Sequence, residues 1–211
     1  MNTSKFSDQL SLQLLRSRQE SPERIFLLGF LHYAGVGVRQ DYTAALKHFV
    51  DAGEHGLSWA EHAAGFMYET GKGTEKDLRA AIVWYRRAAD RSHAPALCAL
   101  ALILKFGPDD LRDQPQAFDL FTRAAGLGNC MAALQAADSL ERGLGVERDE
   151  AAARDWYFRA AEISDESTAA AHAAVASLYR DGRLGVSVDS SKAEQWAESS
   201  RNLLRAQGPG G

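Results

Sequence analysis

The sequence is short of the residues that mark several classes of protein. Two cysteines are too few for a disulfide framework, and five prolines in 211 residues are too few for a disordered, proline-rich chain. Acidic residues outnumber basic ones by 28 to 24, and no cluster of Lys and Arg is present to neutralise phosphates. We therefore expect a folded protein that does not bind nucleic acid.

Long apolar runs are also missing. No stretch of about 18 apolar residues occurs, which predicts no membrane span and no membrane partner. Residues 1–20 lack the basic segment and the run of about 7 to 15 apolar residues that a secretory signal requires. We interpret Cys98 and Cys130 as core residues in a reducing compartment, because free cysteines are usually buried. These features predict a cytoplasmic protein.

What the sequence does contain is an internal repeat. An Asp followed four residues later by Ala recurs with a period of 36 residues, and a fifth copy is slightly displaced. The pairs are Asp41 and Ala45, Asp77 and Ala81, Asp113 and Ala117, Asp149 and Ala153, and Asp189 and Ala193. A period of about 20 to 50 residues is typical of stacked repeat arrays, so we expect one elongated domain.

The second copy, residues 58–92, predicts a helix, a loop and a second helix. Small and aromatic residues share one face of the first helix: Ala60, Ala64, Gly65 and Tyr68. Gly71 and Gly73 interrupt the pattern, and a second helix is expected to begin after Asp77.

The recurring glycine and aspartate have separate physical reasons. A glycine at one loop position suits a chain that leaves a helix through a positive φ. It recurs at Gly35, Gly71, Gly107, Gly143 and Gly182. The aspartates are expected to cap the second helices by accepting hydrogen bonds from free backbone N–H groups. Residues 107–111 depart from the usual Gly-x-Gly-Val, which predicts a distorted turn in the third copy.

The combined pattern reads Ala-x-x-x-Leu/Ala-Gly-x-x-Tyr-x-x-Gly-x-Gly-Val-x-x-Asp-x-x-x-Ala-x-x-Trp-Tyr-x-x-Ala-Ala. This string resembles the Sel1-like repeat, a relative of the tetratricopeptide repeat. The resemblance implies an all-α fold, a right-handed α/α superhelix (solenoid) of five helix-turn-helix repeats, with the first helix of each pair on the concave side. The expected repeats are residues 21–56, 57–92, 93–128, 129–164 and 165–201.

Both ends are expected to cap the array. Residues 1–20 predict an N-terminal capping helix, because apolar residues alternate with polar ones over residues 4–19. A C-terminal cap is expected to extend to residue 206, and residues 207–211 are expected to be a flexible tail.

No motif for chemistry stands out. His-Glu-x-x-His, paired cysteines and Gly-x-Ser-x-Gly are missing, so we expect no enzyme, no metal and no cofactor. Gly71-Lys72-Gly73-Thr74 resembles a phosphate-binding loop only superficially, because the lysine is not followed directly by Ser or Thr.

The resemblance implies a scaffold or adaptor that binds other proteins, in bacterial signalling or secretion. One alternative is an immunity protein or chaperone that neutralises or loads a single secreted toxin. Another is an amide or β-lactam hydrolase, although the cysteine pairs of such family members are missing here. The oligomeric state is left open.

Residues that differ between copies on the first helices are expected to decide binding, since the packing positions are already committed. The predicted partner-binding residues are Phe26, Phe30, Tyr33, Trp59, His62, Phe66, Glu69, Leu102 and Lys105. The apolar members would form one wall of a concave groove that holds a peptide or helix, and Tyr33, Glu69 and Lys105 would belong to its polar rim. The alternative is that these aromatic residues pack on one another as ordinary core.

Overall fold

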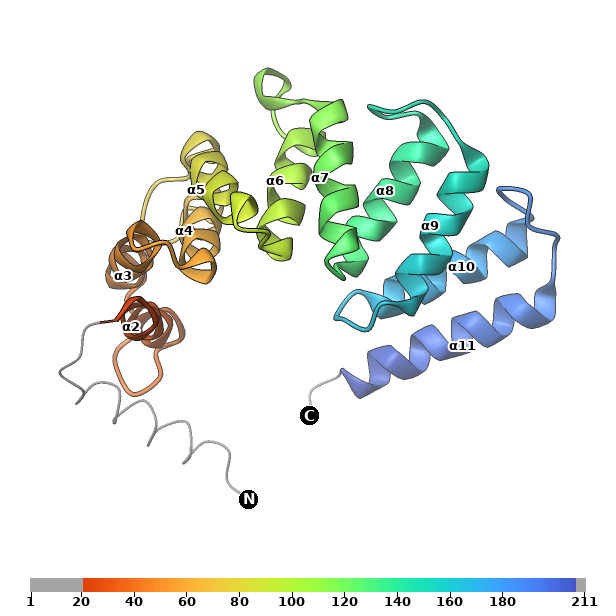
Figure 1. Cartoon of the computed structure of the whole chain (residues 1–211). Coiled ribbons are helices and arrows are strands. Elements are labelled where there is room, and N and C mark those ends of the chain that lie inside the picture. Colours follow the sequence, from red (N-terminus) through yellow and green to blue (C-terminus); the bar gives the residue numbers. More distant parts are fainter. Residues whose placement is uncertain (1–20, 208–211) are drawn as a thin grey trace. The chain divides into compact units, whose positions relative to one another are not determined.

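The computed structural model describes residues 21–207, and that part of the chain is helical without strands (Figure 1). The elements in order are α2 (Pro22–Ala34), α3 (Tyr42–Glu54), α4 (Ser58–Thr70), α5 (Leu78–Asp90), α6 (Ala94–Phe106), the 3-10 helix η1 (Asp109–Leu111), α7 (Gln114–Gly126), α8 (Cys130–Arg142), α9 (Glu150–Glu162), α10 (Thr168–Asp181) and α11 (Ser190–Ala206). The predicted all-α repeat fold is confirmed. The predicted N-terminal capping helix lies outside the described residues, as does the predicted tail from residue 208 onward.

The described residues divide between Ala96 and Leu97 into two compact units, which we call the N-terminal and C-terminal units. In the N-terminal unit α2 packs on α3, α3 on α4, and α4 on α5. In the C-terminal unit each helix from α7 to α11 packs on the next. Within each unit these helices therefore pack against their sequence neighbours, as expected for a repeat array.

The recurring aspartates cap the second helix of every repeat, as predicted. In each case a carboxylate oxygen accepts a hydrogen bond from the backbone N–H three residues later, at 2.9–3.0 Å. Such caps typically stabilise a helix by about 1 kcal/mol.

The recurring glycine confirms its prediction in four copies and departs from it in the third. Gly35, Gly71, Gly143 and Gly182 have φ values between 65° and 71°. The prediction of a positive φ is wrong for Gly107, where the chain turns instead into η1. Glycine is still needed there, because a Cβ would lie 2.4 Å from the Ile103 carbonyl oxygen. The distorted turn expected in this copy is confirmed.

The second glycine of the Gly-x-Gly pair has a role that the sequence did not reveal. A Cβ on Gly73 would lie 2.3 Å from the carbonyl oxygen of Tyr42, at the start of α3. In the C-terminal unit, a Cβ on Gly145 would lie 2.2 Å from the carbonyl oxygen of Gln114, at the start of α7. These glycines let a loop touch the second helix of the preceding repeat.

Alanine substitutions at Gly37 and Gly73 should separate backbone strain from this contact. Both glycines have a positive φ, 70° and 75°, but a Cβ on Gly37 would meet no described atom within 4 Å. Gly37→Ala should lower the free energy of unfolding by about 1 kcal/mol. Gly73→Ala should lower it by about 1–3 kcal/mol more, since the loop must move away. Urea titration followed by circular dichroism measures both, and equal losses would contradict the proposed contact.

Candidate functional site

The N-terminal unit contains a hollow of about 300 Å³ between α2, α3 and α4. Its lining residues are Phe26, Phe30, Tyr33, Phe49, His62, Ala63, Phe66 and Met67. We call it the aromatic hollow. Five of the nine predicted partner-binding residues line it, namely Phe26, Phe30, Tyr33, His62 and Phe66. The other three lining residues, Phe49, Ala63 and Met67, were not predicted from the sequence. Phe49 occupies a packing position, and Ala63 and Met67 each follow a predicted residue on the same helix.

Helical spacing and small residues position the walls of the hollow. Phe26, Phe30 and Tyr33 are four and three residues apart, which places them on one face of α2. On that helix Gly29 lets α3 approach closely, because a Cβ there would lie 2.7 Å from the Phe49 ring. A bulkier residue at position 29 would therefore displace the ring that forms the floor of the hollow.

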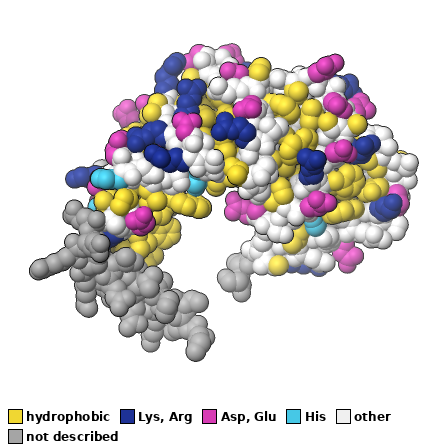
Figure 2. Space-filling view, in the orientation of Figure 1, with side chains coloured by type: hydrophobic (Ala, Val, Ile, Leu, Met, Phe, Trp, Pro, Cys, Tyr) yellow, Lys and Arg dark blue, Asp and Glu magenta, His cyan; other side chains and the backbone are white. Residues whose placement is uncertain are grey.

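Burial separates the groove and core interpretations residue by residue. Phe49 is only 3% exposed and belongs to the core, whereas Phe30 is 49% exposed. Phe26, Tyr33 and Phe66 are partly buried and pack against the core cluster that contains Phe49. Figure 2 shows hydrophobic side chains reaching the surface over the N-terminal helices. The aromatic row is thus core at its base and exposed at Phe30.

Trp59 lies beside the hollow in a cluster with two histidines. It is 57% exposed and packs edge-to-face on His93, with 4.5 Å between ring centroids. The His93 ring is 5.1 Å from that of His62, and its Nδ1 accepts a hydrogen bond from the Ala96 N–H at the start of α6. Burial lowers the pKa of His62 to about 4, with the nearby His93 contributing, and burial also lowers the pKa of His93. Both rings are therefore uncharged at neutral pH.

Glu69, predicted for the polar rim, is bonded within its own repeat. Its carboxylate accepts a hydrogen bond from the Tyr85 hydroxyl at 2.7 Å. Burial, together with this bond, raises the pKa of Tyr85. The same bond joins Tyr157 to Glu141 in the C-terminal unit, at 3.0 Å. It therefore ties the second helix of a repeat to the first.

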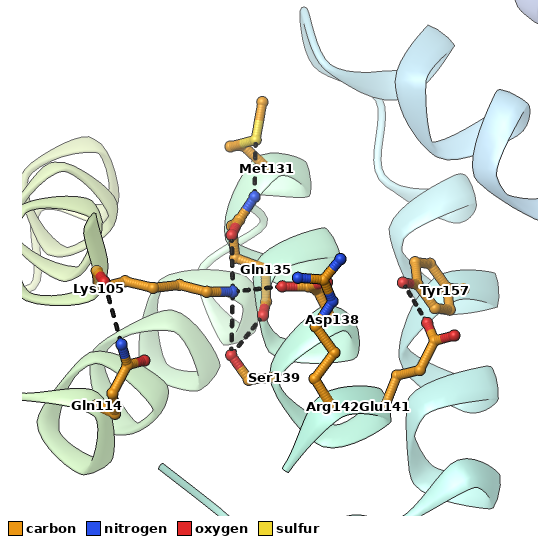
Figure 3. Close-up of polar contacts among 9 residues, drawn as sticks. All are labelled: Lys105, Gln114, Met131, Gln135, Asp138, Ser139, Glu141, Arg142 and Tyr157. Carbon is orange, nitrogen blue, oxygen red and sulfur yellow. Dashed lines mark hydrogen bonds and ion pairs between the residues drawn. The ribbon is translucent and has the colours of Figure 1, made fainter. Parts of the chain in front are cut away.

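Lys105 does not lie on an exposed rim, so that expectation is wrong. It is 3% exposed, and its ammonium donates hydrogen bonds to Asp138 at 2.7 Å and to Gln135 at 3.0 Å (Figure 3). Lys105 lies on the first helix of its repeat, as predicted, but its acidic partner Asp138 belongs to α8 of the next repeat. Leu102 is partly buried in the same C-terminal unit and does not line the aromatic hollow.

Lys72 lies beside the hollow, against two of its lining rings, although in the sequence it stood out only as part of a superficial phosphate-loop pattern. Its ammonium donates a hydrogen bond to the Tyr33 hydroxyl at 2.7 Å. It also lies 4.9 Å from the ring centroid of Tyr33 and 5.4 Å from that of Phe66. Gly71 and Gly73, which flank Lys72, both have a positive φ, and in this loop the Lys72 ammonium lies against two rings that line the hollow.

Groups suited to covalent or metal chemistry are not gathered at any described site. Cys98 and Cys130 are buried and unbonded to each other, and burial raises the pKa of both thiols to about 12. Since the thiolate is the nucleophile, neither is activated at neutral pH. Over residues 21–207 no three His, Cys, Asp or Glu side chains gather to hold a metal ion. No helix in this range has the length and apolarity needed to cross a membrane.

Alanine substitution at Phe30 and Phe49 should distinguish the exposed part of the hollow from its floor. Phe49→Ala should lower the free energy of unfolding by about 3–5 kcal/mol, because it leaves a buried cavity. Phe30→Ala should lower it by less than about 1 kcal/mol, since half of that side chain already faces water. A large loss for Phe30→Ala in chemical denaturation would show that this residue belongs to the core.

The uncharged histidines predict a loss of stability in acid. Below the ordinary histidine pKa of 6.5 the unfolded chain gains protons that folded His62 does not gain until about pH 4. Between about pH 7 and pH 4.5, His62 alone should cost about 2 kcal/mol of the free energy of unfolding. His62→Gln should reduce this pH dependence. Urea titrations at the two pH values test this, and an identical slope in His62→Gln would contradict it.

Comparison with known proteins agrees with the geometry. The Sel1 repeat model matches residues 25–57, 60–93, 94–129, 130–165 and 169–203. A Sel1 repeat protein from Oxalobacter formigenes is similar with a TM-score of 0.83 and 27% identity, over 94% of this chain and 78% of that one. The protective antigen c5321 from uropathogenic Escherichia coli, which displays an SLR fold, has a TM-score of 0.79 and 24% identity, over 95% of this chain and 46% of that one.

More distant likenesses carry no functional argument. An immunity protein from Pseudomonas aeruginosa reaches a TM-score of only 0.40 at 14% identity, over 98% of this chain and 82% of that one. No curated protein matches the sequence. Sel1 repeat proteins are generally non-catalytic scaffolds that bind other proteins. With five matched repeats that together span more than half of its length, this chain belongs to the Sel1 repeat family.

Proposed function

We propose that this protein is a non-enzymatic scaffold or adaptor that holds a segment of another protein in the aromatic hollow. The observation that carries the proposal is the half-exposed Phe30 at the edge of a hollow lined by aromatic and aliphatic side chains and the uncharged His62. Exposed aromatic side chains at such a hollow, here Phe30 at its edge and Trp59 beside it, usually mark an interface.

The size of the hollow limits what it can hold. About 300 Å³ lies at the lower end of the range of ligand pockets, which is roughly 300–1,000 Å³. One or two bulky side chains of a peptide or helix fit such a volume, as in recognition by a few anchor residues. Trp59 lies beside the hollow and would contact the flank of the bound segment. The proposed binding site does not include Glu69, which is bonded to Tyr85, or Leu102 and Lys105, which belong to the C-terminal unit.

The setting we propose is bacterial signalling or secretion in the cytoplasm. This part rests on the family, on the bacterial origin of its structural neighbours and on the two unbonded, buried cysteines. A reducing compartment suits such cysteines.

The test compares Phe30→Ala with Phe106→Ala, a matched control. Phe106 is also exposed, at 62%, but belongs to the C-terminal unit and does not line the hollow. Proteins captured from bacterial lysate by the unmodified chain should be retained by Phe106→Ala. They should bind about tenfold more weakly to Phe30→Ala, since an anchor contact worth about 1.4 kcal/mol is lost. Quantitative mass spectrometry measures retention, and equal capture by all three proteins would count against the hollow as the binding site.

A further inference from the structure

A single positive charge stands against the wall of the aromatic hollow. The Lys72 ammonium lies over three rings, those of Tyr33, Tyr42 and Phe66, with distances of 4.9–5.5 Å to the ring centroids. Two of these rings, Tyr33 and Phe66, also line the hollow. Aromatic faces attract a cation, so these contacts hold the ammonium in place.

The hydrogen-bonding capacity of this ammonium is only partly used. A lysine ammonium has three donors, and within residues 21–207 the one hydrogen bond of the Lys72 ammonium goes to the Tyr33 hydroxyl. No described carboxylate pairs with it. Lys105 is different, because its ammonium lies 2.7 Å from Asp138. The Tyr33 oxygen accepts from Lys72, which leaves the hydroxyl proton of Tyr33 free to be donated elsewhere.

The lining of the hollow supplies no negative charge to offset that of Lys72. No acidic residue is among its lining residues, and His62 is uncharged at neutral pH. The hydrogen bond to Tyr33 raises the pKa of Lys72, so that side chain keeps its charge. Lys72 is therefore a positive charge beside an otherwise uncharged hollow, although the chain as a whole carries a net charge of −4.

We propose that the protein segment bound in the aromatic hollow carries a carboxylate beside its apolar anchor, and that Lys72 and the Tyr33 hydroxyl bind this carboxylate. The inference rests on the function proposed above and names the chemistry of the bound segment. The carboxylate belongs to an Asp or Glu side chain or to the end of a chain. Hydrogen bonds from an ammonium to a carboxylate are shorter and stronger than neutral ones, so they favour acidic segments over neutral ones of the same shape.

The experiment selects peptides on the full chain and then tests their acidic group. A random heptapeptide library displayed on phage is selected against the immobilised protein, and the enriched peptides are synthesised with a fluorescent label. Each is also made with Asp or Glu changed to the amide, and with its own end as a carboxylate or a carboxamide. Fluorescence anisotropy then measures Kd for the unmodified chain, Lys72→Gln, Lys72→Arg and Lys76→Gln.

Enriched peptides should combine a large apolar residue with a neighbouring carboxylate. Neutralising the carboxylate should weaken binding to the unmodified chain about tenfold, a change of about 1.4 kcal/mol. The same change should have less than about a twofold effect on Lys72→Gln. Lys72→Arg keeps the charge and should keep the preference for an acid. Lys76→Gln removes an exposed charge from the same loop and should behave like the unmodified chain.

Several results would overturn the inference. These are tight binding of peptides without an acid, an acid preference that survives Lys72→Gln, and a selection that enriches no sequence. Self-association that is lost in Phe30→Ala would also overturn it, since a second copy would then occupy the hollow. Peptides that need Phe30 but no acid would leave the proposed function standing, whereas acidic peptides that bind Phe30→Ala normally would remove the hollow as the site.

Discussion

Close approach between helices is the constraint on which the rest of the structure depends. Gly29 and Gly65 face the rings of Phe49 and Tyr85, where a Cβ would lie 2.7 Å from the nearest ring atom. In these two repeats the first helix lacks a side chain at this position, so the second helix can place a ring against its backbone. Because protein interiors are close-packed, such a pairing of small with large residues leaves little freedom in how the two helices lie. Side chains on the remaining faces are then free to differ.

That freedom gives the same repeat position opposite characters in the two units. Phe30 and Asp138 occupy equivalent positions in the first and fourth copies. In the N-terminal unit Phe30 is half exposed at the edge of the aromatic hollow. In the C-terminal unit Asp138 pairs with Lys105 and Arg142, so that position is occupied by an internal ion pair. The buried Lys105 and its acid form a structural contact. Lys72 contacts rings but no described acid, so its ammonium still has hydrogen-bond donors for a ligand.

The predictions that succeeded depend on residues close together in the chain. A helix, its cap and its terminating glycine are decided within about four residues, so the repeat pattern located the helices and all five aspartate caps. The failures involve more distant neighbours. Lys105 was expected on a rim because its acid lies 33 residues further along, in the next repeat. Gly107 was expected to have a positive φ like the equivalent glycines, but the residues that replace Gly-x-Gly-Val in this copy form a 3-10 helix after it.

For the candidate site, the sequence by itself predicted which helix faces could meet a partner, because the recurring positions were assigned to packing. Only the tertiary structure decided which of those residues gather into one hollow, which are half buried as core, and which are paired internally. It also brought Lys72 from a loop onto the ring of Tyr33, 39 residues earlier in the chain. The physical reason is that helical periodicity sets the direction of a side chain relative to its own helix axis, whereas burial and charge pairing depend on the helices packed against it.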